Sequence, residues 1–395
     1  MTEQTNTPEL RFPGFRDEWK VTKLGNILED TNVKENYNVP LYSLTVENGI
    51  TEKTERYNRE FLVKKNNNFK IVKPFNIVYN PMNITLGAID LLSMDKEIKV
   101  SGYYNVLRII NQTNPFFLIN LLKTYKSILL FKKVATGSLR EKQRVHFSEF
   151  KNLKKYLPSY IEQEKIGSFF SKLDRQIELE EKKLELLEQQ KKGYMQKLFS
   201  QELRFKDKNG DEYPNWNTSQ LGEITKTFSG GTPKSNNSSY YNGDIPFIRS
   251  GEISKRITEL KITETALNNS SAKLVEKGDL LYALYGATSG EVAISKINGA
   301  INQAVLCIKS EESINFLLNF LRLQKQHILK TYIQGGQGNL SASIVKGITI
   351  KLPCREEQKK IGKFLDKVGI LIEKQSTKID LLKQRKQGLL QKMFV

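Results

Sequence analysis

The sequence predicts an α+β protein: two α/β-mixed domains separated by two long helices that form an intramolecular antiparallel coiled coil, with a pseudo-twofold internal repeat. Three observations support this prediction. A long segment occurs twice, that segment has apolar residues at helical spacing, and the segments between its copies mix strand-like with helix-like patterns. At roughly 150 residues per domain, a chain of 395 residues accommodates two or three domains.

The repeat sets the domain organisation. Residues 157–199 align with residues 352–394 without a gap, and 20 of the 43 positions are identical. A shorter repeat precedes each copy, because Leu10-Arg11-Phe12 and Trp19 recur as Leu203-Arg204-Phe205 and Trp216. We therefore expect one module written twice. Its segments are 1–156 (N-terminal segment and first variable domain), 157–200 (first helical region), 201–351 (second variable domain) and 352–395 (second helical region).

Each long copy is expected to be one helix. Its apolar residues alternate at steps of three and four, as in a coiled-coil seam. The predicted seam comprises Ile166, Phe170, Leu173, Ile177, Leu184, Leu187, Ile361, Leu365, Val368, Ile372, Ile379 and Leu382. A helix of about 35 to 40 residues is about 50 to 60 Å long, and the other copy is the economical partner for its stripe. The alternative is that the stripes only join separate molecules into oligomers.

The segments between the helices are predicted to mix strands and helices. Strand-like runs are 69–80, 103–110, 278–286 and 303–308, and helix-like runs are 116–131 and 314–330. Residues 76–88 also align with residues 279–291, which pairs Tyr79 with Tyr282. We interpret both tyrosines as core aromatics.

Charge is the outlying property of the composition. Lys and Arg total 62 against 43 Asp and Glu, a formal net charge of +19, and this excess favours a polyanionic partner such as double-stranded DNA. No run approaches the 18 or so apolar residues of a membrane span. The first residues lack the basic start and apolar core of a secretory signal. We therefore expect a cytoplasmic protein with no membrane partner.

The sequence lacks recognisable catalytic motifs. Two cysteines and two histidines cannot form a Cys/His zinc cluster, and no Walker-type phosphate loop occurs. Asn80-Pro81-Met82-Asn83 lacks the second proline of the Asn-Pro-Pro-aromatic loop of adenine methyltransferases, and Phe228-Ser229-Gly230-Gly231 does not complete an F-x-G-x-G cofactor loop. We expect no catalytic residue, no metal and no cofactor. A self-sufficient DNA methyltransferase is the disfavoured alternative.

Three motifs together resemble the specificity subunit of type I restriction-modification enzymes. They are the repeated LP-x-x-x-EQ-x-KIG-x-F helix start, the closing QK-x-F, and the stretch SGGTPKSNNSSYYNGDIPFIRSGEI at 229–253. The resemblance covers nearly the whole chain. It implies a non-catalytic DNA reader whose two target-recognition domains each read half of a split asymmetric site. It also implies that the helices set the spacer and dock two modification (methyltransferase) subunits, with restriction (motor-nuclease) subunits in the full complex.

The loops that match the family's DNA-facing loops supply candidate DNA-binding residues. Bases are read by forked donors and acceptors, whereas Lys, Ser, Thr and backbone amides bind phosphates. The candidates are Asn48, Asn80, Asn83, Thr85, Arg140, Lys142, Gln143 and Arg144 in the first domain, and Ser229, Gly230, Gly231, Thr232, Lys234, Arg249, Ser250, Tyr285, Gly286, Thr288, Gln334 and Gln337 in the second. The alternative for each is a turn cap or a surface bridge. Met82 can pack against a thymine methyl or the core.

Partner docking is assigned to the outward helix faces, because the seam residues are used between the helices. The candidates are Gln163, Lys165, Gln358 and Lys360. Helix capping or simple solvation is the alternative.

Overall fold

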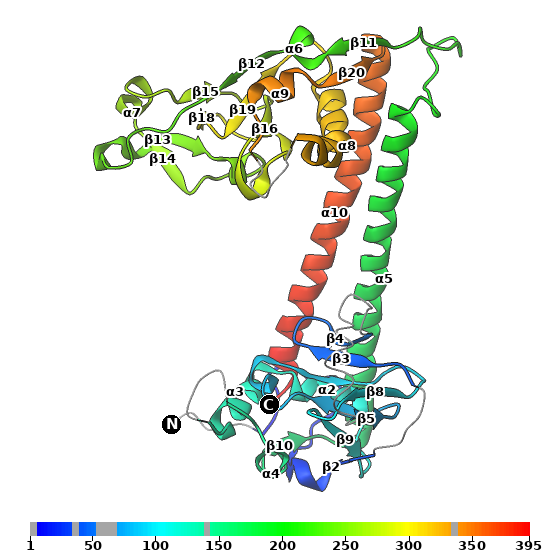
Figure 1. Cartoon of the computed structure of the whole chain (residues 1–395). Coiled ribbons are helices and arrows are strands. Elements are labelled where there is room, and N and C mark those ends of the chain that lie inside the picture. Colours follow the sequence, from blue (N-terminus) through cyan, green and yellow to red (C-terminus); the bar gives the residue numbers. More distant parts are fainter. Residues whose placement is uncertain (1–5, 34–38, 53–68, 138–142, 333–338) are drawn as a thin grey trace. The chain divides into compact units, whose positions relative to one another are not determined.

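The computed structural model describes residues 6–33, 39–52, 69–137, 143–332 and 339–395. The chain forms two compact units, one made of Met1–Lys182 with Thr377–Val395 and the other of Lys183–Ser376. The long helices α5 (Tyr160–Phe199) and α10 (Arg355–Met393) each contribute one part to each unit. Figure 1 shows the strands and helices within each unit.

A four-stranded antiparallel sheet with the order β2-β9-β6-β7 organises the first unit. Its strands are β2 (Leu28–Asp30), β9 (Asn105–Ile109), β6 (Ile77–Tyr79) and β7 (Ile89–Leu91). Three antiparallel pairs accompany it: β3 (Tyr42–Thr45) with β4 (Gly49–Glu52), β5 (Phe69–Val72) with β8 (Ile98–Ser101), and β1 (Lys20–Lys23) with β10 (Lys154–Leu157). A parallel bridge between Leu41 and Lys99 links the start of β3 to β8.

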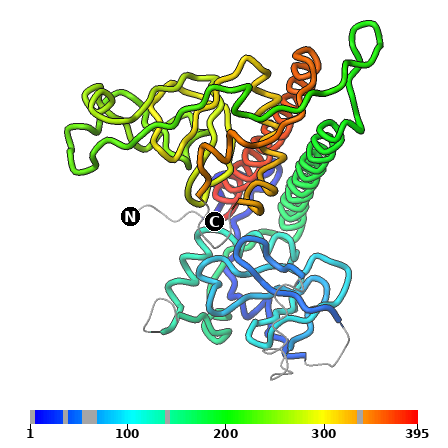
Figure 2. The backbone as a smooth tube through the Cα atoms, turned by 45° about the horizontal axis from the view of Figure 1, so that its top comes forward, coloured from blue at the N-terminus to red at the C-terminus, as the bar shows by residue number. Residues whose placement is uncertain are grey.

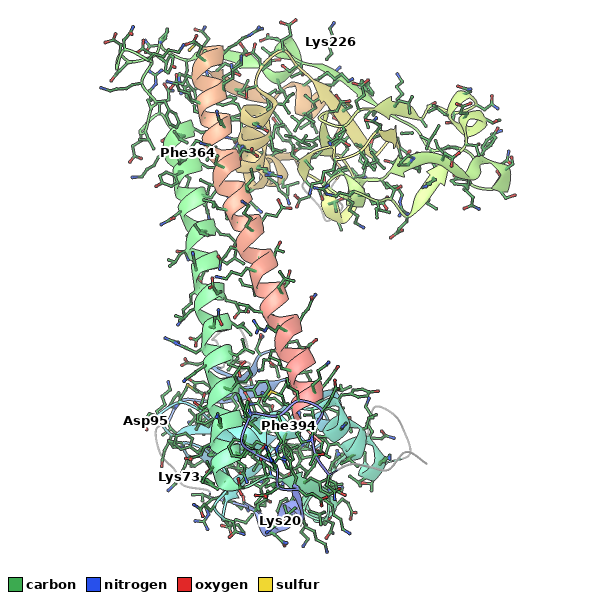
Figure 3. The ribbon with its side chains drawn as sticks, turned by 180° about the vertical axis from the view of Figure 1, so that it is seen from behind. Lys20, Lys73, Asp95, Lys226, Phe364 and Phe394 are labelled. Carbon is green, nitrogen blue, oxygen red and sulfur yellow. The ribbon has the colours of Figure 1, made fainter. Side chains whose placement is uncertain are left out.

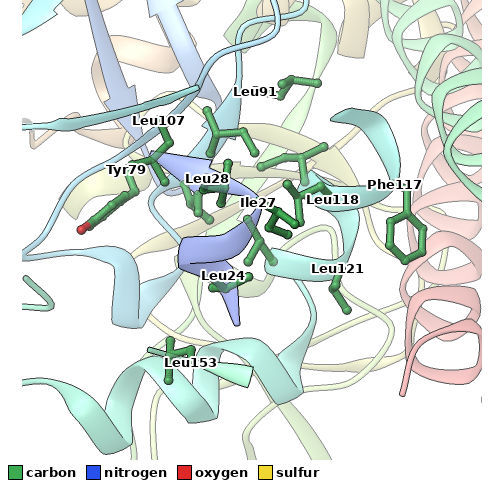
Figure 4. Close-up of a cluster of buried hydrophobic side chains, with 14 of the residues drawn as sticks. Leu24, Ile27, Leu28, Tyr79, Leu91, Leu107, Phe117, Leu118, Leu121 and Leu153 are labelled. Carbon is green, nitrogen blue, oxygen red and sulfur yellow. The ribbon is translucent and has the colours of Figure 1, made fainter. Parts of the chain in front are cut away.

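Both faces of this sheet are buried. Side chains alternate along a strand, so Tyr79 joins one core cluster and its neighbour Val78 joins the other. The first cluster includes residues of α2 (Pro115–Leu122), α3 (Tyr125–Val134) and α4 (Phe147–Phe150), and Figure 4 shows Leu107 and Leu118 within it. The run at 116–131 forms two helices rather than one, because the Thr124 hydroxyl caps α3 by accepting the Ser127 N–H.

The second unit repeats this arrangement with the order β12-β19-β16-β17. These strands are β12 (Lys226–Ser229), β19 (Val305–Lys309), β16 (Leu280–Ala283) and β17 (Val292–Ile294). The other sheet, in the order β14-β13-β18-β15, comprises β14 (Leu260–Ile262), β13 (Tyr241–Ile248), β18 (Gly299–Ile301) and β15 (Lys273–Val275). The remaining elements are the pair β11 (Asn217–Gln220) with β20 (Thr349–Leu352), and α6 (Leu221–Ile224), α7 (Glu264–Asn268), α8 (Ile314–Tyr332) and α9 (Ala342–Lys346).

The internal repeat therefore extends to the fold of the variable domains, and the backbone trace in Figure 2 lets the reader follow each copy by itself. Tyr79 on β6 and Tyr282 on β16 occupy equivalent strands, and both are fully buried, which confirms them as core aromatics. The Tyr79 hydroxyl donates to the carbonyl of Val145 at 3.4 Å. Burial raises the pKa of both phenols, that of Tyr282 to about 12.

The long helices are antiparallel in each unit. In the first unit Lys378 pairs with Glu180 and Lys386 with Asp174, so positions further along α10 meet earlier positions of α5. In the second unit the Phe364 ring meets the Tyr194 ring edge-on, with centroids 5.1 Å apart. Figure 3 labels Phe364 on α10. The predicted intramolecular coiled coil is confirmed.

The predicted seam residues are all at least half-buried. The buried members are Ile166, Phe170, Leu173, Ile177, Ile361, Leu365 and Ile379, and the half-buried members are Leu184, Leu187, Val368, Ile372 and Leu382. The apolar stripe also packs into the cores of the domains. Ile166 and Phe170 belong to the core of the first unit, and Ile361 and Leu365 to the core of the second. The first turns of each helix are thus integral to a domain core.

Candidate nucleic-acid interface

In the first unit, polar loops converge at one end of the central sheet. The loop after Tyr79 is closed by the Asn80 N–H, which donates to the Ala88 carbonyl at 3.0 Å. The Val145 N–H donates to the Pro81 carbonyl, also at 3.0 Å, and brings the segment around residue 144 to this loop. Loops at the ends of paired strands are held by the sheet while their side chains stay accessible.

The candidates in this loop have different exposures. Asn83 is exposed, whereas Asn80 is half-buried and its side-chain oxygen accepts the Met82 N–H at 3.0 Å. Thr85 is buried, 9% exposed, so its side chain is not presented at the surface as expected for a DNA contact. Met82 is half-buried, and both of its interpretations stay open.

Arg144 is anchored at the surface beside an aromatic ring. Its Nη2 donates to the Tyr103 hydroxyl at 3.2 Å, and its guanidinium lies 5.5 Å from the centre of that ring. Its backbone bridges Thr136. Tyr103, 59% exposed, was missed by sequence reasoning. The signal was available in Gly102-Tyr103-Tyr104, a turn between two strands with an aromatic at its tip.

The other four candidates of the first domain include two whose positions are not described. Arg140 and Lys142 fall outside the described residues, whereas Gln143 is half-buried next to Arg144. Asn48 is exposed on the turn between β3 and β4. This turn is fixed to strand β7, because the Ile50 N–H donates to Asp90 Oδ2 at 3.0 Å.

In the second unit, the equivalent sheet end carries Ser229 and the glycine loop. A Cβ on Gly230 would lie 1.8 Å from the Ile301 carbonyl oxygen, and one on Gly231 would lie 2.5 Å from Ser271 Cβ. The Gly230 N–H donates to the Asn302 carbonyl at 3.3 Å. These glycines therefore allow the loop to pack closely against neighbouring backbone, and their role in DNA binding stays a prediction.

The side chains around that loop are polar and mostly accessible. Lys234 is exposed, and the Thr232 hydroxyl donates to Gln303 Oε1 at 2.6 Å. Gln303, in the turn between β18 and β19, matches the place of Tyr103 in the turn between β8 and β9. Sequence reasoning did not single out Gln303, although Asn302-Gln303 between two strands was the available signal.

Arg249 is held by two carboxylates. Its Nε donates to Glu252 Oε2 at 3.0 Å, and its Nη2 pairs with Glu259. These bonds raise the pKa of Arg249. Glu252 is buried, 3% exposed, and Arg249 is about one-third exposed, so the guanidinium is fixed in direction while part of it stays accessible.

The other candidates of the second domain lie on neighbouring short segments. Tyr285 and Gly286 are exposed, and Ser250 and Thr288 are half-buried. The turns Ser250–Glu252 and Gly286–Thr288 contact each other. Gln334 and Gln337 fall outside the described residues.

The docking candidates require a correction. Gln163 and Gln358 are buried, 4% and 1% exposed, instead of lying on outward helix faces. Gln163 Nε2 donates to the Pro158 carbonyl at 3.0 Å, and its Oε1 accepts the Asn114 N–H at 3.0 Å. Gln358 forms the same bond to the Pro353 carbonyl. The Leu-Pro start of each repeat turns the chain so that this glutamine ties the helix to its own domain.

The two lysines of the docking set are more accessible. Lys165 is exposed, with its Nζ 5.3 Å from the centre of the Phe12 ring. Lys360 is half-buried, with its Nζ 5.2 Å from the centre of the Tyr213 ring. Their docking role stays a prediction.

The described residues contain neither a metal-binding cluster nor a membrane-spanning helix. No group of three or more His, Cys, Asp or Glu side chains in these ranges is arranged to hold a metal ion. No helix of the described part of the chain has the length and apolarity to cross a membrane.

The chain thus has two copies of one α+β fold, each with a polar loop cluster at one end of its central sheet, together with an antiparallel helix pair. This architecture is that of a two-domain DNA-specificity protein. The sequence model of the family described as "Type I restriction modification DNA specificity domain" matches residues 16–189 and again residues 213–384. The chain belongs to this family.

Individual relatives agree with this assignment. The chain is 29% identical over 295 residues to the putative type I restriction enzyme MjaX specificity subunit of Methanocaldococcus jannaschii, which covers 71% of the chain and 68% of the relative. It is 28% identical over 167 residues to the EcoR124I/EcoR124II specificity subunit of Escherichia coli, which covers 40% of the chain and 41% of the relative.

Solved structures share the fold. The S subunit of a type I restriction-modification system from M. genitalium superposes with a TM-score of 0.64 at 16% identity, covering 98% of this chain and 99% of that one. A chain from a study of complex assembly and conformational transition of the type I R-M system gives a TM-score of 0.54 at 19% identity, with the same coverage.

Proposed function

We propose that the chain is the non-catalytic DNA-recognition subunit of a type I restriction-modification complex in the cytoplasm. Each recognition domain reads one half of a bipartite, asymmetric site on double-stranded DNA. The helices set the spacer between the halves and dock two modification (methyltransferase) subunits. Restriction (motor-nuclease) subunits join in the full complex, and adenine methylation and DNA cleavage reside in these partners.

One observation carries the proposal: the same sheet occurs twice, and each copy ends in loops with accessible Arg, Asn, Lys and Tyr side chains. In the first unit these are Asn83, Tyr103 and Arg144, and in the second Lys234 and Tyr285. Arg and Asn read bases through paired hydrogen bonds, and Lys binds phosphates as a point charge. Different side chains on equivalent loops suit two unlike half-sites.

A methyl-transfer assay tests the absence of intrinsic activity. The purified chain should transfer no methyl group to any duplex, and addition of the modification subunit should give sequence-specific adenine methylation. Methylation by the isolated chain would favour the self-sufficient methyltransferase.

The salt dependence of DNA affinity tests the binding itself. Neutralisation of phosphates releases counterions, so the logarithm of the association constant should fall linearly with the logarithm of the salt concentration. A protein that only forms coiled-coil oligomers would show no such dependence.

A further inference from the structure

The first unit contains a basic pocket that none of the described DNA-binding candidates lines. Its volume is about 980 Å³. Lys126 and Lys133 of α3 line it together with Lys154 and Lys155 of β10. Lys126 Nζ also donates to the carbonyl of Phe394, which forms part of the wall, at 3.5 Å. Four lysines thus line one cavity.

Lys155 is the unusual member of this set. It is 3% exposed, although lysine is rarely buried without a partner. In the strand pairs that the repeat makes equivalent, Lys155 lies opposite Thr22 and Ile350 lies opposite Ser219. Ile350 is fully buried. The fold therefore needs only an apolar side chain at this place, and the first unit has a cation there instead.

The side chains that line the pocket carry too little negative charge to balance these lysines. Within the described ranges, none of the four lysines forms an ion pair, and the one carboxylate side chain in the wall, Glu9, pairs with Lys392 at 3.0 Å. Burial and the nearby Lys126 charge lower the pKa of Lys155 to about 8, so its ammonium is still mostly protonated at neutral pH. Holding a buried charge without a partner is unfavourable, and a bound anion would offset this cost.

We propose that this pocket binds a phosphate-bearing ligand, with Lys155 at its centre and Lys126, Lys133 and Lys154 around it. Lysine ammonium groups bind phosphates as mobile point charges. A cavity of about 980 Å³ is at the upper end of the range for small-molecule sites, and the side chains of Leu129 and Phe394 give it an apolar wall. The phosphate comes either from a free polyphosphate compound or from the backbone of a nucleic acid.

Thermal unfolding of the full chain with inorganic tripolyphosphate tests this proposal. Tripolyphosphate should raise the unfolding midpoint of the wild type. Lys155→Ile, which installs the residue of the other repeat, and Lys133→Ala should each remove most of the shift. The matched control is Lys132→Ala, an exposed neighbour on the same helix that does not line the pocket, and it should respond as the wild type does.

The outcomes are distinguishable even if one variant folds poorly, because Lys155→Met provides a second test at the same position. No shift in the wild type at low salt, or an equal shift in Lys155→Ile, Lys155→Met and the control, would overturn the proposal. If a short duplex competes with tripolyphosphate and Lys155→Ile lowers the salt slope of DNA binding by about one, the phosphate belongs to the DNA backbone. Without competition, it belongs to a free compound.

Phosphate binding in this pocket is expected to be independent of the recognition of the two DNA half-sites. Methylation by Lys155→Ile with its modification subunit should keep the wild-type sequence preference. Loss of all sequence preference, with the tripolyphosphate response intact in the wild type, would count against the proposed function and not against the pocket.

Discussion

Glu162 and Glu357 hold equivalent buried positions at the start of the two long helices, 1% and 0% exposed. Arg11 donates to both oxygens of Glu162 at 2.7 Å, and Arg204 does the same to Glu357 at 3.2 and 2.7 Å. Each pair fastens the irregular segment that precedes the first strand of a domain, β1 or β11, to a long helix. These bonds raise the pKa of both arginines.

The Arg11–Glu162 and Arg204–Glu357 pairs differ by one additional hydrogen bond to the glutamate, so the two glutamates can be compared directly. Trp216 Nε1 donates to Glu357 at 3.1 Å, whereas the buried Trp19 Nε1 has no partner among the described residues. Glu162→Ala should cost about 3 kcal/mol of unfolding free energy. Glu357→Ala should cost about 1 to 3 kcal/mol more, because a second donor is orphaned. Urea denaturation of both variants measures this, and equal losses would show that the indole bond contributes nothing.

Arg144 is the residue on which base recognition is best tested. Arg144→Ala should relax or abolish recognition of one half-site, at about 1 to 3 kcal/mol, and leave the other half-site intact. The measurement is methylome sequencing of cells that carry the variant with its modification subunit. Arg108→Ala, which removes an exposed arginine paired with Glu29 on the same domain, is the control. A uniform loss across all sequences would identify Arg144 as a phosphate contact.

The burial of Lys155 predicts how the stability of the protein depends on pH. Its folded-state pKa of about 8 lies below the ordinary lysine value near 10.4. Below about pH 8 the folded state must bury a charge, and between about pH 8 and 10.4 only the unfolded state holds the extra proton, so this cost falls as pH rises. Lys155→Ile should therefore be more stable than the wild type at pH 7, and the difference should shrink by pH 10. A difference that is constant with pH would show that the ammonium is not desolvated.

Substitution of two glycines in helix α5 distinguishes the effect of close packing on stability from the effect of helix propensity. A Cβ on Gly167 would lie 2.4 Å from Asn114 Oδ1 and 2.9 Å from the Phe117 nitrogen, whereas nothing lies within 4 Å of one on Gly193. Gly193→Ala should stabilise the protein by up to about 1 kcal/mol. Gly167→Ala should destabilise it, because the helix must move away from α2. The two unfolding midpoints check this, and a gain for both would mean that the α5–α2 contact can relax.

The helices and their pairing could be predicted from the sequence because a repeated stripe at steps of three and four has few other solutions. The burial of Gln163 and Gln358 could not be predicted from the sequence. Helical spacing gives the face of a residue, but the Leu-Pro turn that folds the chain back over the glutamine is a tertiary arrangement. The same limit explains Gly230 and Gly231, since the residues that approach them, Ile301 and Ser271 respectively, come from much later in the chain.

In the molecule as a whole, the sequence alignment that pairs Tyr79 with Tyr282 falls on equivalent strands of the two central sheets, because buried strands preserve their pattern when loops diverge. The loop tips preserved no pattern between the two copies. Tyr103 and Gln303 occupy matching turns but share no chemistry, so an alignment between the copies could not find them. Divergence at these tips above a common sheet is what two different half-sites require.

The continuous helices lead to a prediction about spacing. Inserting four residues between Glu180 and Leu187 lengthens α5 by about 6 Å, close to two base pairs at about 3.4 Å each. The preferred spacer of the methylated site should then change while both half-site sequences stay the same. The control is the same insertion after Gly210, in an exposed turn that belongs to neither helix, and it should leave the spacer unchanged. Methylome sequencing reads both quantities at once, and altered half-sites with an unaltered spacer would show that the helices do not act as the ruler.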